Sequence, residues 1–158
     1  MIKSHSHYFT SSARNIFKEA QQAAERFEQT YIAPEHFLVG LASGEATNAS
    51  RLLNKLEVEP QRLREAAEQA IAEQLAAHPD SQRQWLGLTD EAKQAVEWAV
   101  DEAHQEQLSS VGSEHLLLAL LRQHGTLASE VLEKLGISLE AGRAQLQRLR
   151  QGGHLSEP

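Results

Sequence analysis

The sequence aligns with itself, without a gap, when it is shifted by 79 residues. Of the 56 pairs that residues 9–64 form with residues 88–143, 15 are identical, which is about three times what shared helical composition alone would give. A duplication of this length makes each half one structural unit. It also means that a site built by one half has a counterpart in the other.

Each half contains four segments in which apolar residues recur with the 3.6-residue period of a helix. Only 5% of the residues are aromatic, and an apolar share made mostly of Ala and Leu favours packed helices over sheets. A four-helix unit of about 60 residues is marginally stable alone, so we expect the two copies to share one core. The sequence therefore predicts an all-α fold, in which two tandem four-helix repeats pack as one pseudo-two-fold eight-helix domain.

Residues typical of helix ends support these segments. Thr10 and Thr89 stand at matched positions before the first segment of each half, where N-caps belong. The second segment begins with Pro34 in one copy and with Ser113, a candidate cap, in the other. Gly136 is suited to end the third segment of the second copy.

The duplication predicts five parts of the chain. We expect, in order, a flexible N-terminus (1–8), a first repeat (9–75), a linker (76–88), a second repeat (89–150) and a C-terminal tail (151–158).

Charge and composition exclude several classes of partner. The 15 basic and 22 acidic residues give a formal net charge of −7, and no basic run is present, which disfavours nucleic acid and anionic membranes. Cysteine is absent, no stretch is long and apolar enough to span a bilayer, and the first residues lack an apolar signal region. We therefore expect a cytoplasmic protein.

The sequence lacks the signatures of common enzymes. It has no G-x-x-x-x-G-K-[ST], G-x-G-x-x-G, G-x-S-x-G or H-E-x-x-H motif. His5 and His7 form the closest histidine pair, but they belong to a polar N-terminal segment that we do not interpret as a metal site. We expect no catalytic activity, no cofactor and no bound metal.

The Glu-His dipeptide is the polar pair that both halves preserve at the start of a segment, as Glu35-His36 and Glu114-His115. A glutamate in the first turn is favoured by the helix dipole, and the histidine can bond to backbone, so a structural role explains the position. Alternatively, the glutamates accept hydrogen bonds from basic groups of a bound polypeptide. Thr10 and Thr89, read first as caps, are candidates for the same site.

Taken together, the motifs resemble those of the Clp N-terminal repeat domain, the double four-helix module of Clp-type AAA+ unfoldases. The resemblance rests on FTSSARNIFKEAQQAAERF with APEHFLVGL, and on LTDEAKQAVEWAVDEA with VGSEHLLLALL. It covers residues 9–150 and in detail looks more similar to the ClpC branch than to the ClpB branch. It implies a module that docks substrates or adaptors and leaves ATP hydrolysis to a AAA+ ring.

In the ClpC branch the glutamate of the repeated motif helps to recognise arginine-phosphorylated substrates, which here implicates Glu35 and Glu114. Pro34 and Ser113 stand where that branch usually has Thr, and HSHYFT lacks the basic residue common before Phe-Thr. We therefore interpret the two sites as general protein-docking sites for peptides or adaptors, formed by Glu35, His36, Glu114, His115, Thr10 and Thr89.

The expected partners are Clp ATPase subunits, adaptors or unfolded client proteins, with weak self-association as a further possibility. The alternative is a free-standing helical scaffold or self-associating regulator unrelated to Clp ATPases. Residues 1–79 carry a net charge of −2 (8 basic, 10 acidic) and residues 80–158 carry −5 (7 basic, 12 acidic). We expect basic segments to dock first on the more acidic second repeat.

Overall fold

The computed structural model describes residues 8–43, 46–78 and 85–155. Within these ranges the chain forms eight helices and two very short strands, as predicted for an all-α fold of two four-helix repeats. In chain order they are α2 (Ser11–Arg26), β1 (Tyr31–Ile32), α3 (Pro34–Leu41), α4 (Asn48–Lys55), α5 (Pro60–Ala77), β2 (Gly87–Leu88), α6 (Asp90–Gln105), α7 (Ser113–Arg122), α8 (Leu127–Lys134) and α9 (Leu139–Gln151).

Two short backbone pairings join the repeats, and in each of them a residue of repeat 1 pairs with a residue of repeat 2 or of the segment just before it. Ile32 in β1 pairs in parallel with Leu88 in β2, and Phe9, the first residue of repeat 1, pairs in parallel with Val111 of repeat 2. The offset of 79 residues relates Phe9 to Leu88 and Ile32 to Val111, so each pairing is the image of the other. These matched pairings confirm that the repeats form one pseudo-two-fold body.

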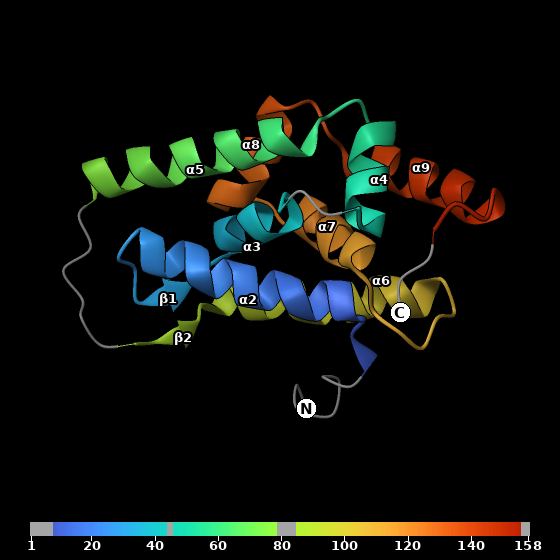
Figure 1. Cartoon of the computed structure of the whole chain (residues 1–158), viewed down its shortest axis with the longest axis horizontal. Helices are drawn as coiled ribbons and strands as arrows, with labels where there is room; N and C mark the ends of the chain where they lie inside the picture. Colours follow the sequence, from blue (N-terminus) through green and yellow to red (C-terminus); the bar gives the residue numbers. More distant parts are fainter. Residues whose placement is uncertain (1–7, 44–45, 79–84, 156–158) are drawn as a thin grey trace.

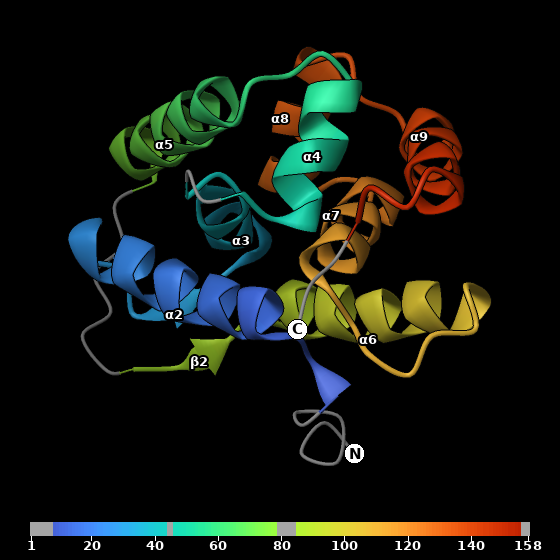
Figure 2. The ribbon, with the colours of Figure 1, turned by 45° about the vertical axis from the view of Figure 1, so that its right-hand side comes forward.

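Helices α3 and α7 lie at the centre of this body (Figures 1 and 2). Every residue of α3 is buried, and so is α7 from Ser113 to Leu121. Helices α2 and α6 form the lower layer in both views, and the remaining helices cover the other side. Helix α4 packs against α7 of the other repeat, and α3 packs against α8, so the core is shared.

The helix ends follow the sequence with one exception. Pro34 is the first residue of α3, and Gly136 follows the end of α8 with a φ of 78°, where a residue without Cβ has no steric penalty. The prediction that Ser113 caps α7 is wrong: Gly112 is the N-cap, and the Ser113 hydroxyl accepts a hydrogen bond from the backbone N–H of Ala49 at 2.9 Å. Ser113 therefore joins the two repeats.

The predicted linker is ordered at both ends. Helix α5 continues to Ala77, and Gly87–Leu88 form β2. The backbone N–H of Leu86 donates to the Thr30 carbonyl at 2.7 Å, while the side chains of Trp85 and Leu86 remain about half exposed. Residues 79–84, most of the predicted N-terminus and the last three residues lie outside the described ranges.

Candidate functional site

Thr10 and Thr89 serve as the helix caps that the sequence predicts. The Thr10 hydroxyl accepts a hydrogen bond from the backbone N–H of Ala13 at 3.1 Å, and the Thr89 hydroxyl does the same for Ala92 at 3.1 Å. They begin α2 and α6. A direct role of either threonine in binding stays a prediction.

The two histidines of the Glu-His pairs are buried and use both ring nitrogens. Nδ1 of His36 accepts from the Ala33 N–H at 2.8 Å, and Nδ1 of His115 accepts from the Gly112 N–H at 2.9 Å. Each Nδ1 is therefore unprotonated, which leaves the proton on Nε2. Burial lowers the pKa of His36 to about 4, in agreement with a neutral ring.

The Nε2 partners of the two histidines differ. Nε2 of His36 lies 2.5 Å from Gln29 Oε1, and Nε2 of His115 lies 2.6 Å from Glu106 Oε1. A neutral amide thus holds the first ring, and a carboxylate holds the second. This is one difference between the repeats that the shared Glu-His motif conceals.

Glu114 lies at the contact between the repeats and is 2% exposed. Its Oε2 accepts hydrogen bonds from Asn48 Nδ2 of α4, at 3.1 Å, and from Nη2 of Arg150 in α9. Its Oε1 is buried without a hydrogen-bond partner among the described residues. The carboxylate of repeat 2 is therefore ion-paired within the chain.

Glu35, the counterpart of Glu114, is 6% exposed and forms no ion pair with a described residue. Burial raises the pKa of the Glu35 carboxyl, its own backbone N–H lowers it in part, and the nearby charge of Glu91 raises it further. Ile71 stands where repeat 2 has Arg150. The two glutamates thus occupy matched positions in different electrostatic surroundings.

Arg150 and Glu106 join α9 to the end of α6 in a bidentate ion pair. The distances are 2.9 Å from Nε to Oε2 and 3.0 Å from Nη2 to Oε1. Burial alone would raise the pKa of Glu106, but hydrogen bonds from His115 and Arg150, together with the charge of Arg150, hold it at about 2. Glu106 is therefore ionised near neutral pH.

A second ionic cluster lies one turn earlier in α6. Glu102 accepts hydrogen bonds from Arg143 of α9 at 2.6 Å and from Arg122 of α7 at 3.0 Å. Arg122 also donates to Asp101 at 2.9 Å and lies 4.6 Å from the centre of the Trp98 ring. The acidic side of α6 is thus neutralised by arginines of α7 and α9.

Between α6 and α9 these side chains border a groove of about 510 Å³. Its apolar part is formed by leucines and its rim by glutamines, and the two ion-pair clusters form its walls. The lining residues are Glu102, Gln105, Glu106, Leu108, Leu118, Arg143, Leu146, Gln147, Arg150 and Gln151. This volume is in the range of pockets that bind side chains or small ligands.

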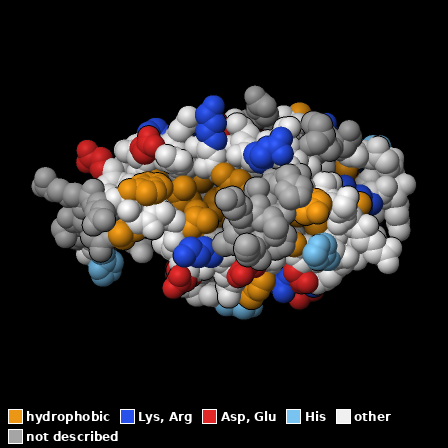
Figure 3. Space-filling view, turned by 90° about the horizontal axis from the view of Figure 1, so that it is seen from below, with side chains coloured by type: hydrophobic (Ala, Val, Ile, Leu, Met, Phe, Trp, Pro, Cys, Tyr) orange, Lys and Arg blue, Asp and Glu red, His pale blue; other side chains and the backbone are white. Residues whose placement is uncertain are grey.

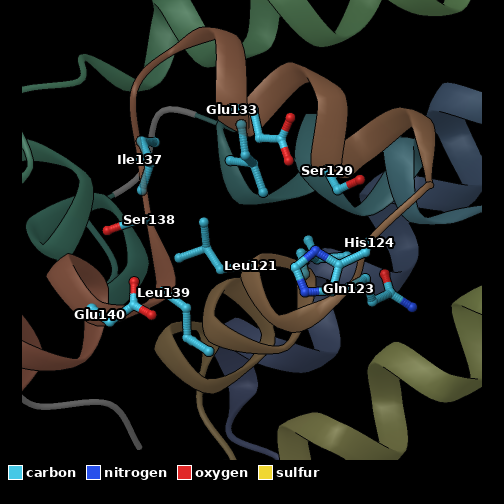
Figure 4. A pocket seen from close by; sticks show the side chains of 11 residues that line it. Leu121, Gln123, His124, Ser129, Glu133, Ile137, Ser138, Leu139 and Glu140 are labelled. Carbon is cyan, nitrogen blue, oxygen red and sulfur yellow. The ribbon is translucent and has the colours of Figure 1, made fainter.

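A smaller cavity of about 240 Å³ lies between α7, α8 and the start of α9 (Figure 4). Leu121 and Ile137 belong to its apolar lining, and His124, Glu133 and Glu140 lie around it. A third cavity of about 290 Å³ lies between α2 and the end of α3.

Apolar side chains also gather in a band on the face that carries α2, α6 and the two strands (Figure 3). The most exposed large apolar residues of the described chain are Tyr8, Trp85 and Leu86, at 46%, 48% and 56%.

None of the six residues predicted from sequence lines any of these three cavities. Glu114 and His115 lie directly behind the α6–α9 groove, because they contact Arg150 and Glu106, which line it. The sequence analysis missed the lining residues. No local pattern indicated them, because they come from α6, α7 and α9, which lie far apart in the sequence.

Across residues 8–43, 46–78 and 85–155, no group of three or more His, Asp or Glu side chains is arranged to hold a metal ion. His5 and His7 lie outside those ranges. No described helix combines the length and apolarity needed to cross a membrane.

The family model described as "Clp repeat (R) N-terminal domain" matches the chain twice, over residues 8–85 and 87–154. The chain belongs to the Clp N-terminal repeat family. Its two matches reproduce the duplication found in the sequence. Both are to the N-terminal repeat, which is a different module from the ATPase.

Relatives of this Clp repeat domain include both branches. It is 34% identical over 141 residues to the "Chaperone protein ClpB" of Oceanobacillus iheyensis, covering 89% of this chain and 17% of that protein. It is 33% identical over 141 residues to "Negative regulator of genetic competence ClpC/MecB" of Bacillus subtilis, with the same coverages. The domain thus spans about a sixth of the length of these relatives, which represent the two branches at nearly equal identity.

Solved structures show the same fold. The N-terminal domain of the ClpD chaperone from Arabidopsis thaliana superposes with a TM-score of 0.68 at 18% identity, covering 91% of this chain and 96% of that one. The Hsp104 N-terminal domain from Candida albicans gives a TM-score of 0.66 at 22% identity, covering 90% and 91%.

Proposed function

We propose that this chain is a non-catalytic docking domain of the Clp chaperone and protease system, which receives substrates or adaptors for a AAA+ unfoldase in the cytoplasm. Membership of the Clp repeat family supports this role. The names of the relatives, a chaperone and a regulator in the Clp system, support the same role. ATP hydrolysis belongs in this proposal to a partner or to other modules.

The observation that carries the docking role is the α6–α9 groove. Leu108, Leu118 and Leu146 give it an apolar lining, and exposed Gln105 and Gln147 offer hydrogen bonds at the rim. The charged walls are already neutralised by internal ion pairs. The partner that fits is an amphipathic polypeptide segment, which inserts apolar side chains and bonds to the glutamines.

The Glu-His residues have distinct roles in this proposal. Glu114 and His115 support the groove from behind, by holding Arg150 and Glu106. Because Glu114 is already paired with Arg150, we do not assign phosphoarginine recognition to repeat 2. His36 stabilises the start of α3 through its bond with the Ala33 N–H, and neither Glu35 nor His36 borders a described cavity.

Binding to an unfolded client tests the proposed function. Fluorescein-labelled α-casein is titrated with the chain and followed by anisotropy. Gln147→Trp fills the groove from an exposed position of α9, and we expect it to weaken binding about tenfold or more, equivalent to about 1.4 kcal/mol. Gln69→Trp makes the same change at an exposed position of α5 and should bind as the wild type does.

The proposal fails if the wild-type chain does not bind casein, or if Gln147→Trp binds it as tightly as Gln69→Trp does. Light scattering on the same samples tests the self-association alternative. A stable dimer with no casein binding would favour the free-standing scaffold, with the apolar band of Figure 3 as its contact surface.

A further inference from the structure

Nine of the ten residues that line the α6–α9 groove differ from their counterparts in repeat 1, and three of these differences concern the Arg150 ion pair and the partners of the two histidines. Glu106, Leu108 and Arg150 line the α6–α9 groove of repeat 2. Their counterparts in repeat 1 are, in the same order, Phe27, Gln29 and Ile71. In repeat 1, Arg26 of α2 and Glu68 of α5, which match Gln105 and Gln147, form an ion pair at 3.2 Å.

The exchange of Arg150 for Ile71 changes how closely the fourth helix of each repeat packs. Ile71 is 1% exposed and belongs to the core. The side chain of Arg150 keeps 26% of its surface exposed and reaches Glu106 through two hydrogen bonds. Apolar side chains such as Phe27 and Ile71 are stabilised by leaving water, which favours close packing of α5. The charged guanidinium of Arg150 favours contact with water, and it reaches across to the carboxylate of Glu106.

The other two exchanges keep each histidine satisfied. Because Gln29 is the hydrogen-bond partner of His36, residue 27 does not need to be polar, and Phe27 packs against the core. Because Glu106 is the hydrogen-bond partner of His115, residue 108 does not need to be polar, and Leu108 lines the groove. The histidine partner and the apolar residue have changed places between the repeats.

We propose that Glu106, Leu108 and Arg150 act together as positioning residues that keep the docking groove open in repeat 2, while Phe27, Gln29 and Ile71 keep repeat 1 closed. This inference rests on the proposed docking function. It assigns one groove, not two, to each chain.

The triple variant Glu106→Phe, Leu108→Gln, Arg150→Ile tests this by giving repeat 2 these three residues of repeat 1. Repeat 1 already accommodates this set beside the buried Glu35, which forms no ion pair with a described residue, so the variant should fold, as checked by circular dichroism. We expect its affinity for labelled α-casein to fall about tenfold or more. Wild-type affinity in the folded variant would overturn the inference.

A distance measurement tests whether the groove has narrowed, and it needs no ligand. The chain contains no cysteine, so Gln105→Cys with Gln147→Cys places two spin labels on opposite sides of the groove. We expect the triple exchange to shorten the distance between the labels. An unchanged distance with a native fold would contradict the positioning role even if casein binding were lost.

A single exchange keeps the inference testable if the triple variant does not fold. Arg150→Gln removes the ion pair, and Arg148→Gln makes the same change at an exposed neighbour in the same turn. Only Arg150→Gln should weaken casein binding and alter the label distance; equal effects of the two would overturn the inference. If Gln147→Trp has no effect on casein binding in the wild type, the proposed function itself is wrong, independently of these variants.

Discussion

At the scale of single residues, the histidine of the repeated Glu-His pair makes the same backbone contact in both repeats, whereas the surroundings of the glutamate differ. Both histidines accept from the backbone N–H three residues earlier and so fix the start of α3 and α7. The neighbouring glutamate has no ion pair among the described residues in repeat 1 and is bound to Arg150 in repeat 2. We therefore expect the ionised Glu35 to destabilise the fold and the ionised Glu114 to stabilise it.

Substituting the two glutamates tests this contrast. The pKa of Glu35 is raised above its usual 4.5, so the folded state binds this proton more tightly than the unfolded state does, and ionisation destabilises the fold as the pH rises. We expect Glu35→Gln to raise the free energy of unfolding at pH 7 by about 1 kcal/mol, with no gain below about pH 4.

Glu114→Gln should instead lower the free energy of unfolding at pH 7 by about 2 kcal/mol, because it replaces the charged acceptor of the Arg150 hydrogen bond with a neutral amide. Urea unfolding followed by circular dichroism at both pH values measures these differences. A lower stability of Glu35→Gln than of the wild type at pH 7 would show that the carboxylate has a stabilising partner.

At the scale of helices, the sequence predicts well what local rules decide. Thr10 and Thr89 cap their helices because capping needs only a hydroxyl three residues before a free N–H. The groove was not predictable in this way. Its ion pairs join Arg150 to Glu114 and Glu106, residues 36 and 44 positions apart, and no local pattern specifies which acid a distant arginine meets.

Helix packing also explains one residue that differs between the repeats. A Cβ added to Gly40 would lie 2.8 Å from the Ile16 carbonyl oxygen of α2, so α2 and α3 can approach this closely only because residue 40 lacks a side chain. Its counterpart in α7 is Ala119, which is fully buried. The first repeat is therefore packed more tightly at this contact.

Gly40→Ala is expected to lower the free energy of unfolding by about 2 kcal/mol, as overpacking against rigid backbone does. Ala119→Gly, the reverse change at the matched position, should cost about 1 kcal/mol through helix propensity. Thermal unfolding followed by circular dichroism compares them. A melting temperature of Gly40→Ala equal to the wild type would mean that α2 and α3 separate without cost.

At the scale of the whole molecule, duplication gives one stable core and lets the two surfaces diverge. The sequence revealed the pseudo-two-fold fold because the repeats share their buried positions, and it concealed the groove because they differ at the surface. Repeat 2 carries more acidic residues, but Asp101, Glu102, Glu106 and Glu114 are paired with its own arginines. In the proposed function, docking on repeat 2 therefore relies on the groove that these pairs border rather than on free negative charge.

Mapping a bound client onto the two repeats tests this asymmetry most directly. A ¹⁵N-labelled chain is titrated with unlabelled α-casein, and the backbone amide signals are followed by NMR. We predict that the perturbed signals concentrate in the C-terminal half of α6 and in α9, and that α2 and α5 are unaffected. Equal perturbation of both repeats, or perturbation confined to the apolar band or to the cavity of Figure 4, would contradict a single docking groove in repeat 2.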